Sequence, residues 1–206
     1  MKNFLLSKLI FTTFFGLLGC TVLQPVSPPE LTTYTLEAPL TRLNVRLPGS
    51  DKSILLGNIR ADAELGSKHI LYRKKAFQID VYQQSQWQQS PALMLFPVVT
   101  RALEHSGLFE LVLKTPTPII ADYRLDLNIT SLQQEFTSHP SQVRFGLHAY
   151  LSENKTSVIL GAKEFEAVVA SPSEDAYGAV IASNIAVAQV LQQLTEFCRL
   201  QMSMNK

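Results

Sequence analysis

Apolar and polar residues alternate along several segments of the chain, and this period of two predicts β-strands with one buried face. The pattern is clearest over residues 123–129, where every second side chain is apolar. After Thr130 the apolar positions shift by one, to Leu132, which predicts a β-bulge that exchanges the two faces. Alternation resumes over residues 143–151, and an apolar-rich stretch covers residues 158–170. These segments are expected to form an antiparallel meander.

Weaker strand patterns precede this meander. Residues 34–36 are expected to form a short edge strand, and residues 53–63 a weaker strand. Residues 69–75 and 77–82 also alternate, which is compatible with a hairpin. In the second of these segments, one face is expected to carry Phe77, Ile79 and Val81.

The first of two expected helices follows residue 89. Ser90 is a suitable N-cap, Pro91 suits the first helical position, and apolar residues recur at helical spacing until Gly107. Pro97 lies inside this pattern and lacks the N–H that a helix interior needs. It therefore predicts either a kink or a later start, within residues 92–96.

The second expected helix is long. Residues 171–174, Ser-Pro-Ser-Glu, have the spacing of a capping box, which predicts the start of the helix there. The apolar stripe that follows is expected to contain Tyr177, Val180, Ile181, Ile185, Ala188, Leu191, Leu194 and Cys198. Two helices of this kind would cover one face of the sheet. The predicted fold class is a two-layer α+β domain with a mostly antiparallel mixed sheet and both helices on one face.

The N-terminal 19 residues have the composition of a secretory signal. Lys2 and Lys8 supply positive charge, and an apolar stretch too short to span a bilayer leads to Cys20. Residues 17–20, Leu-Leu-Gly-Cys, resemble the lipobox of bacterial lipoproteins. That resemblance implies a diacylglycerol on the Cys20 thiol, cleavage before Cys20, and acylation of the new amino group, for example with palmitate. The alternative is an ordinary signal peptide with Cys20 nearby by coincidence.

The remaining chain divides into a tether and one domain. Residues 20–33 contain three prolines without regular periodicity, which predicts an extended spacer behind the lipidated cysteine. Residues 34–202 are expected to form a single α+β domain. After removal of residues 1–19, 187 residues with a net charge of −1 remain, a balance without the basic excess of nucleic-acid binders. Cys198 lies on the helical stripe and is expected in the core.

The sequence lacks the spacing of known catalytic and metal-binding motifs. The four histidines, His69, His105, His139 and His148, lie in separate segments without metal-ligand spacing. The chain has neither a Gly-x-Ser-x-Gly motif nor a Walker-type loop, so it is not itself an ATPase. Asp80, Asp122 and Asp126 are expected in strands or turns as solvated acids. We therefore expect no enzyme activity, no metal and no cofactor; a hydrolase is the alternative that substrate panels would expose.

The order of these elements resembles that of the ABC-type transport auxiliary lipoproteins. The resemblance rests on a series of loose motifs in a shared order: the lipobox, Tyr34-Thr35-Leu36, Leu71-Tyr72-Arg73, Trp87 before a helix ending in Leu103, Gly107 and Leu108, then Phe165, Val168 and an alanine-rich helix. It implies a mixed α+β fold with two helices. It also implies a non-enzymatic accessory role in lipid transport, with an MCE-domain protein as partner and, through it, an ABC transporter permease and ATPase or another inner-membrane component.

The resemblance leaves some points open. Thr21 follows the modified cysteine, and the lack of Asp there favours the periplasmic face of the outer membrane. A periplasmic lipid carrier and an outer-membrane activator of a cell-wall synthase remain alternative functions. The carrier would need an apolar cavity between the sheet and the helices, and the activator an affinity for a synthase.

Three residues are candidate partner contacts. Trp87 is interpreted either as a core anchor or as an exposed aromatic contact, and the core is favoured. Tyr72 and Arg73 lie at a strand end beside Lys74 and Lys75, which suits either a solvated end or a contact to lipid phosphates or an acidic partner. The family's Trp-Ala-Glu-Pro run is replaced by Trp-Gln-Gln-Ser-Pro, without the acidic residue. The glutamine-rich residues 83–89 are a further candidate contact.

Overall fold

The computed structural model describes residues 30–39 and 51–204, so the predicted signal and the Cys20 lipidation site lie outside the described residues. The chain from Leu31 onward forms one compact unit. Its elements are β1 (Thr32–Tyr34), β2 (Ser53–Leu56), β3 (Arg60–Ala61), the 3-10 helix η2 (Ala63–Leu65), β4 (His69–Arg73), β5 (Asp80–Trp87), α2 (Pro91–His105), β6 (Leu111–Lys114), β7 (Tyr123–Glu135), β8 (Gln142–Glu153), β9 (Ile159–Ala170) and α3 (Ala176–Met204).

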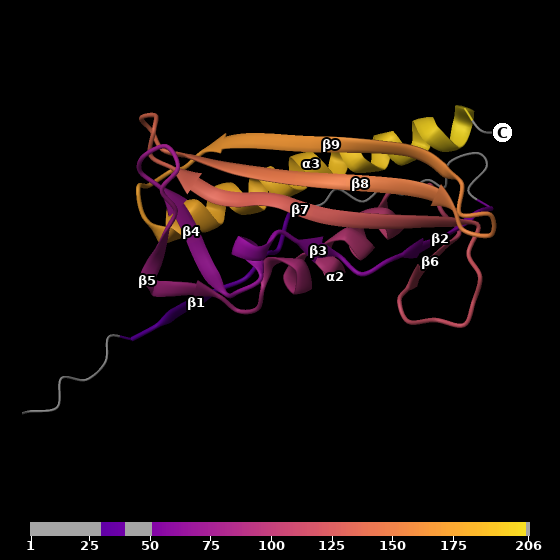
Figure 1. Cartoon of the computed structure of the whole chain (residues 1–206), viewed down its shortest axis with the longest axis horizontal. Helices are drawn as coiled ribbons and strands as arrows, with labels where there is room; N and C mark the ends of the chain where they lie inside the picture. Colours follow the sequence, from indigo (N-terminus) through magenta and orange to yellow (C-terminus); the bar gives the residue numbers. More distant parts are fainter. Residues whose placement is uncertain (1–29, 40–50, 205–206) are drawn as a thin grey trace, which may run out of the picture. The chain divides into compact units, whose positions relative to one another are not determined.

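The strands of this unit form one mixed sheet around β7 (Figure 1). One edge of β7 pairs in parallel with β2, β3 and β4 in turn, and its other edge pairs antiparallel with β8. Beyond β4 the sheet continues to β5 and β1, and beyond β8 it continues to β9. The predicted meander is therefore confirmed, and the long ladders are antiparallel while the short strands join in parallel.

The predicted change of face in β7 is confirmed. Its pairing with β8 shifts between Ile129 and Ser131. The buried positions are 125, 127 and 129 before the shift and 132–134 after it, with 132 and 134 the least exposed. Gly146 lies opposite this irregularity. A Cβ atom at Gly146 would lie 2.4 Å from Thr130 Oγ1 and 2.7 Å from Ser131 Oγ, closer than such atoms approach in proteins. The bulge thus depends on glycine in the neighbouring strand.

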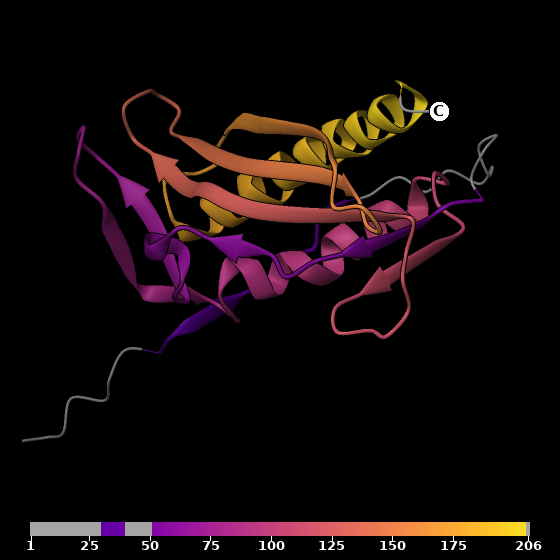
Figure 2. The ribbon, with the colours of Figure 1, turned by 45° about the vertical axis from the view of Figure 1, so that its right-hand side comes forward.

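Both helices cover the same face of the sheet, as predicted (Figures 1 and 2). Helix α3 packs on β8 and β9, whereas α2 packs near β3, β6 and β7 and touches α3. A continuous core of buried side chains fills the space between these layers. Its largest fully buried members include Trp87, Leu95, Leu103, Phe145 and Phe165. The two-layer α+β class is confirmed.

The hairpin of β4 and β5 forms, but its second strand is displaced from the prediction. β4 and β5 pair antiparallel, with Tyr72 opposite Asp80. The predicted place of Phe77 on an apolar face is wrong, because Gln78 N donates to Lys75 O and closes a turn that leaves Phe77 exposed. Ile79 and Val81 pack against the core, as predicted. The strand instead continues through the glutamine-rich stretch to Trp87. Polar side chains suit this strand because it lies near the edge of the sheet, against solvent.

Helix α2 begins at Pro91, so the alternative of a later start is wrong. Pro97 is inside the helix and exposed. The carbonyl that loses its hydrogen bond there belongs to Leu93, whose side chain is 62% exposed, so water can reach this side of the helix. Gly107 follows the helix with φ 66°, the left-handed conformation in which glycine carries no steric cost.

Helix α3 begins later than predicted. Ser171 N donates to Ser141 O at 2.7 Å, which extends the β8–β9 ladder and holds Ser171 in the sheet. The capping box at residues 171–174 is therefore wrong, and Asp175 caps the helix through Gly178 N. The predicted stripe is also partly wrong: Tyr177 is 57% and Ile185 39% exposed, while Val180, Leu191, Leu194 and Cys198 are buried.

Two short strands at the edges of the sheet, β1 and β6, also differ from the prediction. β1 lies two residues before the predicted 34–36 strand, although it is an edge strand as predicted. β6 was not predicted; it pairs in parallel with β2, and its side chains are only partly buried, so its alternation carries a weak signal. The predicted strand over residues 53–63 is divided into β2 and β3.

The alternation in β7 predicts opposite effects for adjacent substitutions. Leu127 is 1% exposed, and Leu127→Asp would bury a carboxylate without a partner, so we expect destabilisation of more than about 4 kcal/mol or failure to fold. Asn128 is partly exposed and donates to Asp62 Oδ1 at 2.9 Å, so Asn128→Ser should cost less than about 1 kcal/mol. Urea unfolding of both variants tests this, and similar midpoints would contradict the assigned faces.

Candidate functional site

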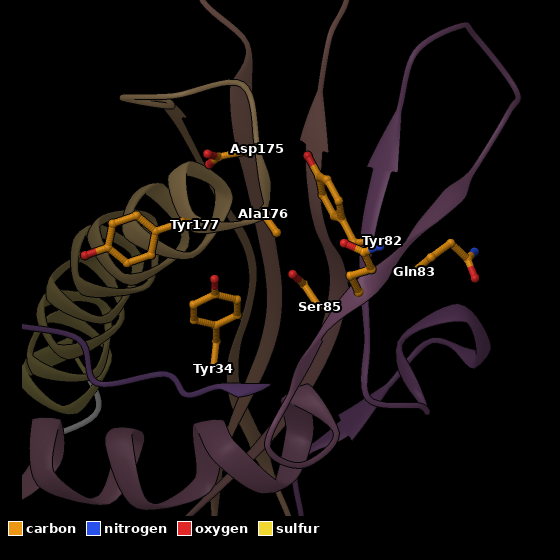
Figure 3. Close-up of a pocket in the computed structure, with 8 residues that line it drawn as sticks. Tyr34, Tyr82, Gln83, Ser85, Asp175, Ala176 and Tyr177 are labelled. Carbon is orange, nitrogen blue, oxygen red and sulfur yellow. The ribbon is translucent and has the colours of Figure 1, made fainter. Parts of the chain in front are cut away.

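A surface cleft of about 410 Å³ lies between β5 and the start of α3 (Figure 3). It is lined by residues from three elements: Tyr34, Tyr82, Gln83, Gln84, Ser85, Asp175, Ala176 and Tyr177. Tyr34 and Ser85 point into the space below Ala176, whereas Gln83 extends from the other side of β5. The site thus joins three segments, of which Tyr34 lies 48 residues before Tyr82, and Ser85 lies 90 residues before Asp175.

The strand wall of the cleft is only partly paired. β1 runs parallel to β5 and pairs with it at Ser85, Gln86 and Trp87. Among the described residues, no strand pairs with Asp80–Gln84 on the β1 side of β5. An unpaired strand edge offers backbone N–H and C=O groups for an added strand. The cleft therefore lies over a strand edge that is open at one end.

The helix wall is fixed by Asp175. Asp175 Oδ1 accepts hydrogen bonds from Gly178 N and from Ser173 Oγ, both at 2.7 Å. The bond from the Gly178 amide, followed by the bond from Ser173, lowers the pKa of Asp175. Gly178 leaves room for the loop, because a Cβ there would lie 2.1 Å from Ser173 O. Asp175 thus serves as a helix cap.

A hydrogen-bond chain holds the upper wall of the cleft. Tyr82 Oη donates to Gln134 Oε1 at 2.5 Å, and Gln134 Nε2 donates to Ser141 Oγ at 2.9 Å. Burial, and then the neighbouring Asp175 carboxylate, raise the pKa of Tyr82 to about 12. Tyr82 is therefore neutral at physiological pH, and its hydroxyl is committed to the buried Gln134.

Aromatic rings border the cleft on both sides. The rings of Tyr34 and Tyr177 lie 6.1 Å apart, so β1 and α3 meet through them. The ring of Tyr72 lies 4.8 Å from the ring of Tyr82 and also contacts the ring of Phe136. Tyrosines of this kind give a large, rigid contact area with polar groups at the edge, a composition typical of protein-binding surfaces.

The arrangement of the cleft does not match a catalytic site. Its lining has neither Cys, His nor Lys, and its one carboxylate caps a helix. In the part of the chain that the structure describes, no group of three or more His, Cys, Asp or Glu side chains is placed to hold a metal. Cys198 is fully buried, and burial raises the pKa of its thiol to about 12, as expected of a core residue. The lining is polar and uncharged apart from the Asp175 carboxylate.

The predicted contact residues have different positions. Trp87 is 1% exposed and belongs to the core, which agrees with the favoured interpretation and removes it from the surface. Tyr72 and Arg73 are partly buried at the end of β4, next to the ring of Tyr82. Gln83 and Gln84 of the glutamine-rich stretch line the cleft. The partner contact of Tyr72 and Arg73 stays a prediction.

Sequence reasoning missed several members of the site. Tyr34 was assigned only to an edge strand, and Tyr177 to a buried helical stripe. Asp175 was not considered because the capping box was placed four residues earlier. The available signal was Asp175 three residues before Gly178, since aspartate is a favoured N-cap and its side chain reaches the third helical amide.

Arg144, Glu135 and Glu166 form a charged cluster that has a structural role. Arg144 contacts Glu135 at 3.0 Å and Glu166 at 2.5 Å, so one guanidinium joins three neighbouring strands. The hydrogen bonds that Arg144 donates to Glu135 and Glu166 raise the pKa of Arg144. Burial raises the pKa of Glu135, but the hydrogen bond from Arg144 outweighs it and holds that pKa below its ordinary value. These charges satisfy one another and leave no free acid or base.

The fold defines a two-layer α+β domain, and comparisons with known proteins place it more closely. The family model of the ABC-type transport auxiliary lipoprotein component matches residues 34–195, so the chain belongs to that family. The comparison with curated proteins found no match.

Two solved structures share the fold. A Xanthomonas campestris protein of the family DUF330 is 22% identical, with a TM-score of 0.75 over 84% of this chain and 98% of the other. An uncharacterised protein is 11% identical, with a TM-score of 0.65 over 82% of this chain and 99% of the other.

The family is one of lipoproteins that accompany a transporter. In the described part of the chain, neither helix is both long and apolar enough to cross a membrane.

The raised pKa of Tyr82 predicts a pH dependence of stability. Between pH 10 and 12 the unfolded chain loses the Tyr82 proton while the folded domain retains it, so stability falls as the pH rises through this window. Tyr82→Phe has no hydroxyl that titrates in this window. The substitution also leaves Gln134 without its donor, which lowers the free energy of unfolding by about 1 kcal/mol at neutral pH. The difference in free energy of unfolding between the wild type and Tyr82→Phe, measured with urea, should therefore be smaller at pH 11 than at pH 7. An unchanged difference would contradict the assignment.

Proposed function

We propose that this lipoprotein is a non-enzymatic, membrane-anchored accessory subunit that docks an MCE-type lipid-transport assembly at the outer membrane. The observation that carries the proposal is the cleft: a surface lined by tyrosine, glutamine and serine with one carboxylate, beside a strand edge that no described strand pairs with. The family supplies the transport context. The partner of the cleft is a peptide segment of the MCE-domain protein, and through that protein the subunit is connected to the permease and ATPase or to another inner-membrane component.

The chemistry of the cleft supports a peptide partner. The edge of Asp80–Gln84 offers backbone groups in line with β1, and a partner strand would pair with them. Gln84 and Ser85 side chains can donate and accept hydrogen bonds, and Tyr34 and Tyr177 supply aromatic contact area. Peptides bound in this mode gain affinity from main-chain hydrogen bonds and specificity from the side-chain contacts.

The core favours this function over the lipid-carrier alternative. A lipid carrier needs an apolar cavity, whereas the space between the sheet and the helices is occupied by buried side chains such as Leu56, Leu127 and Val187. The described cleft is instead polar at its mouth and open at the surface. Activation of a cell-wall synthase would use a protein contact as well, so the identity of the captured partner separates it from the proposal.

The anchor is proposed from the sequence. Acyl chains on Cys20 would hold the domain on the membrane, with the tether setting its range. Thr21, in place of aspartate, favours transfer to the outer membrane.

Cys20→Ala should release the protein from the membrane, because the acyl chains are the proposed anchor. Cell fractionation with the transport partners deleted measures this, and precursor retained by its uncleaved signal is counted separately. A substituted, processed protein that still sediments wholly with outer membranes would contradict the anchor.

Tyr177→Ala and Gln84→Ala should each weaken partner binding about tenfold, since truncation of a contact residue in a binding site costs about 1–2 kcal/mol. Tyr150→Ala is the matched control, because Tyr150 is an exposed tyrosine on β8, outside the cleft. The full-length lipoprotein in detergent is immobilised, and binding of the MCE-domain protein is titrated by interferometry.

Equal binding by the three variants would exclude the cleft as the contact. Recovery of a peptidoglycan synthase, without any lipid-transport component, from an envelope pull-down would favour the activator. Turnover in a panel of ester and glycan substrates would contradict the non-enzymatic assignment.

A further inference from the structure

The tip of the β4–β5 hairpin carries an aromatic residue that the fold does not use. Phe77 is 102% exposed, so its ring makes no packing contact in the domain. Its backbone has φ 64°, in the left-handed region that bulky residues rarely adopt. Gln78 N donates to Lys75 O, which places Phe77 as the third residue of a four-residue turn, a position that favours glycine or asparagine. Stability therefore does not explain a phenylalanine here.

The residues before Phe77 are basic. Arg73, Lys74 and Lys75 follow one another into the turn, and Lys74 and Lys75 are exposed. Lys74 Nζ lies 5.3 Å from the ring centre of Tyr72, which keeps one cation beside the tip. The neighbouring acids are engaged: Asp80 accepts from Gln78 Nε2, and Glu135 is paired with Arg144. The Gln78 amide is uncharged, so Asp80 keeps its negative charge, but Arg73, Lys74 and Lys75 exceed this one nearby carboxylate. The tip thus combines an exposed ring with an excess of positive charge.

The tip and β1 lie toward the same end of the sheet, at opposite ends of the β4–β5 hairpin (Figures 1 and 2). Thr32, the first residue of β1, pairs with Ser85 of β5. Phe77 is eight residues from Ser85, a distance of at most about 27 Å along an extended strand. The 12 residues from Thr21 to Thr32 reach about 37 Å at about 3.1 Å per residue. A membrane that holds Cys20 is therefore within reach of the tip.

We propose that the β4–β5 tip contacts the surface of the membrane that holds the lipid anchor, with Phe77 entering the interfacial region and Lys74 and Lys75 facing anionic lipid headgroups. Aromatic and basic residues are the combination that binds anionic membrane surfaces. The inference rests on the lipid anchor of the proposed function. The tip then orients the domain on the membrane.

The test uses the full lipidated protein in vesicles of phosphatidylethanolamine and phosphatidylglycerol with spin-labelled lipids as fluorescence quenchers. Phe77→Trp places a reporter at the tip, and Ile120→Trp is the control. Ile120 is 68% exposed and precedes β7, at the end of that strand opposite to the tip. The native Trp87 is the single tryptophan of the sequence and is buried, so the wild-type protein supplies the background.

We expect the Phe77→Trp reporter to be quenched at least about twofold more than the Ile120→Trp reporter, since only the tip enters the interface. Adding Lys74→Glu and Lys75→Glu should abolish this difference. Co-sedimentation with the vesicles but equal or absent quenching would overturn the inference and leave the anchor intact. Failure to co-sediment would overturn the anchor and, with it, this inference. Protection of the tip from iodide only after addition of an MCE-domain protein would replace the membrane with a protein contact.

Discussion

The pairing of β7 is the constraint on which the rest of the domain depends. One edge of this strand receives β2, β3 and β4 in succession, and the other carries the β8–β9 ladder, so every layer is placed relative to it. The bulge after Ile129 reverses its faces. The first half of β7 thereby directs Leu125 and Leu127 into the core, and the second half directs Leu132 and Gln134 there. A register shift in this strand would expose both halves at once.

The cleft follows from the same geometry. Gln134 lies on the second half of β7 and is 1% exposed. It accepts a hydrogen bond from the hydroxyl of Tyr82 on β5. Its amide group also donates to Ser141, at the start of the β8 side of the sheet. This one residue thus connects the hairpin to the segment that leads into α3. Asp175 then fixes the first turn of α3 beside it, and the wall of the cleft is complete.

The sequence predicted those parts of the fold whose burial is strongly periodic. Residues 123–129 alternate cleanly because one face meets two helices and the other meets solvent, and the parity change after Thr130 was visible for the same reason. β5 was misplaced because it lies next to the edge of the sheet, where glutamine is tolerated at positions that carry no burial signal. The start of α3 was misplaced because a backbone bond from Ser171 to Ser141, 30 residues away in sequence, overrides a local capping motif. The cleft joins residues from β1, β5 and α3, and neither periodicity nor spacing encodes that proximity.

The account holds that the cleft between β5 and α3 is where the transport partner binds. Site-specific photo-crosslinking in living cells tests this most directly, with a photoreactive amino acid at Gln84 in the cleft and, in a second strain, at Ile120 at the far end of β7. The account predicts a crosslink from position 84 to an MCE-domain protein and none from position 120. Crosslinks to that protein from position 120 alone, or from position 84 to a cell-wall synthase, would contradict it.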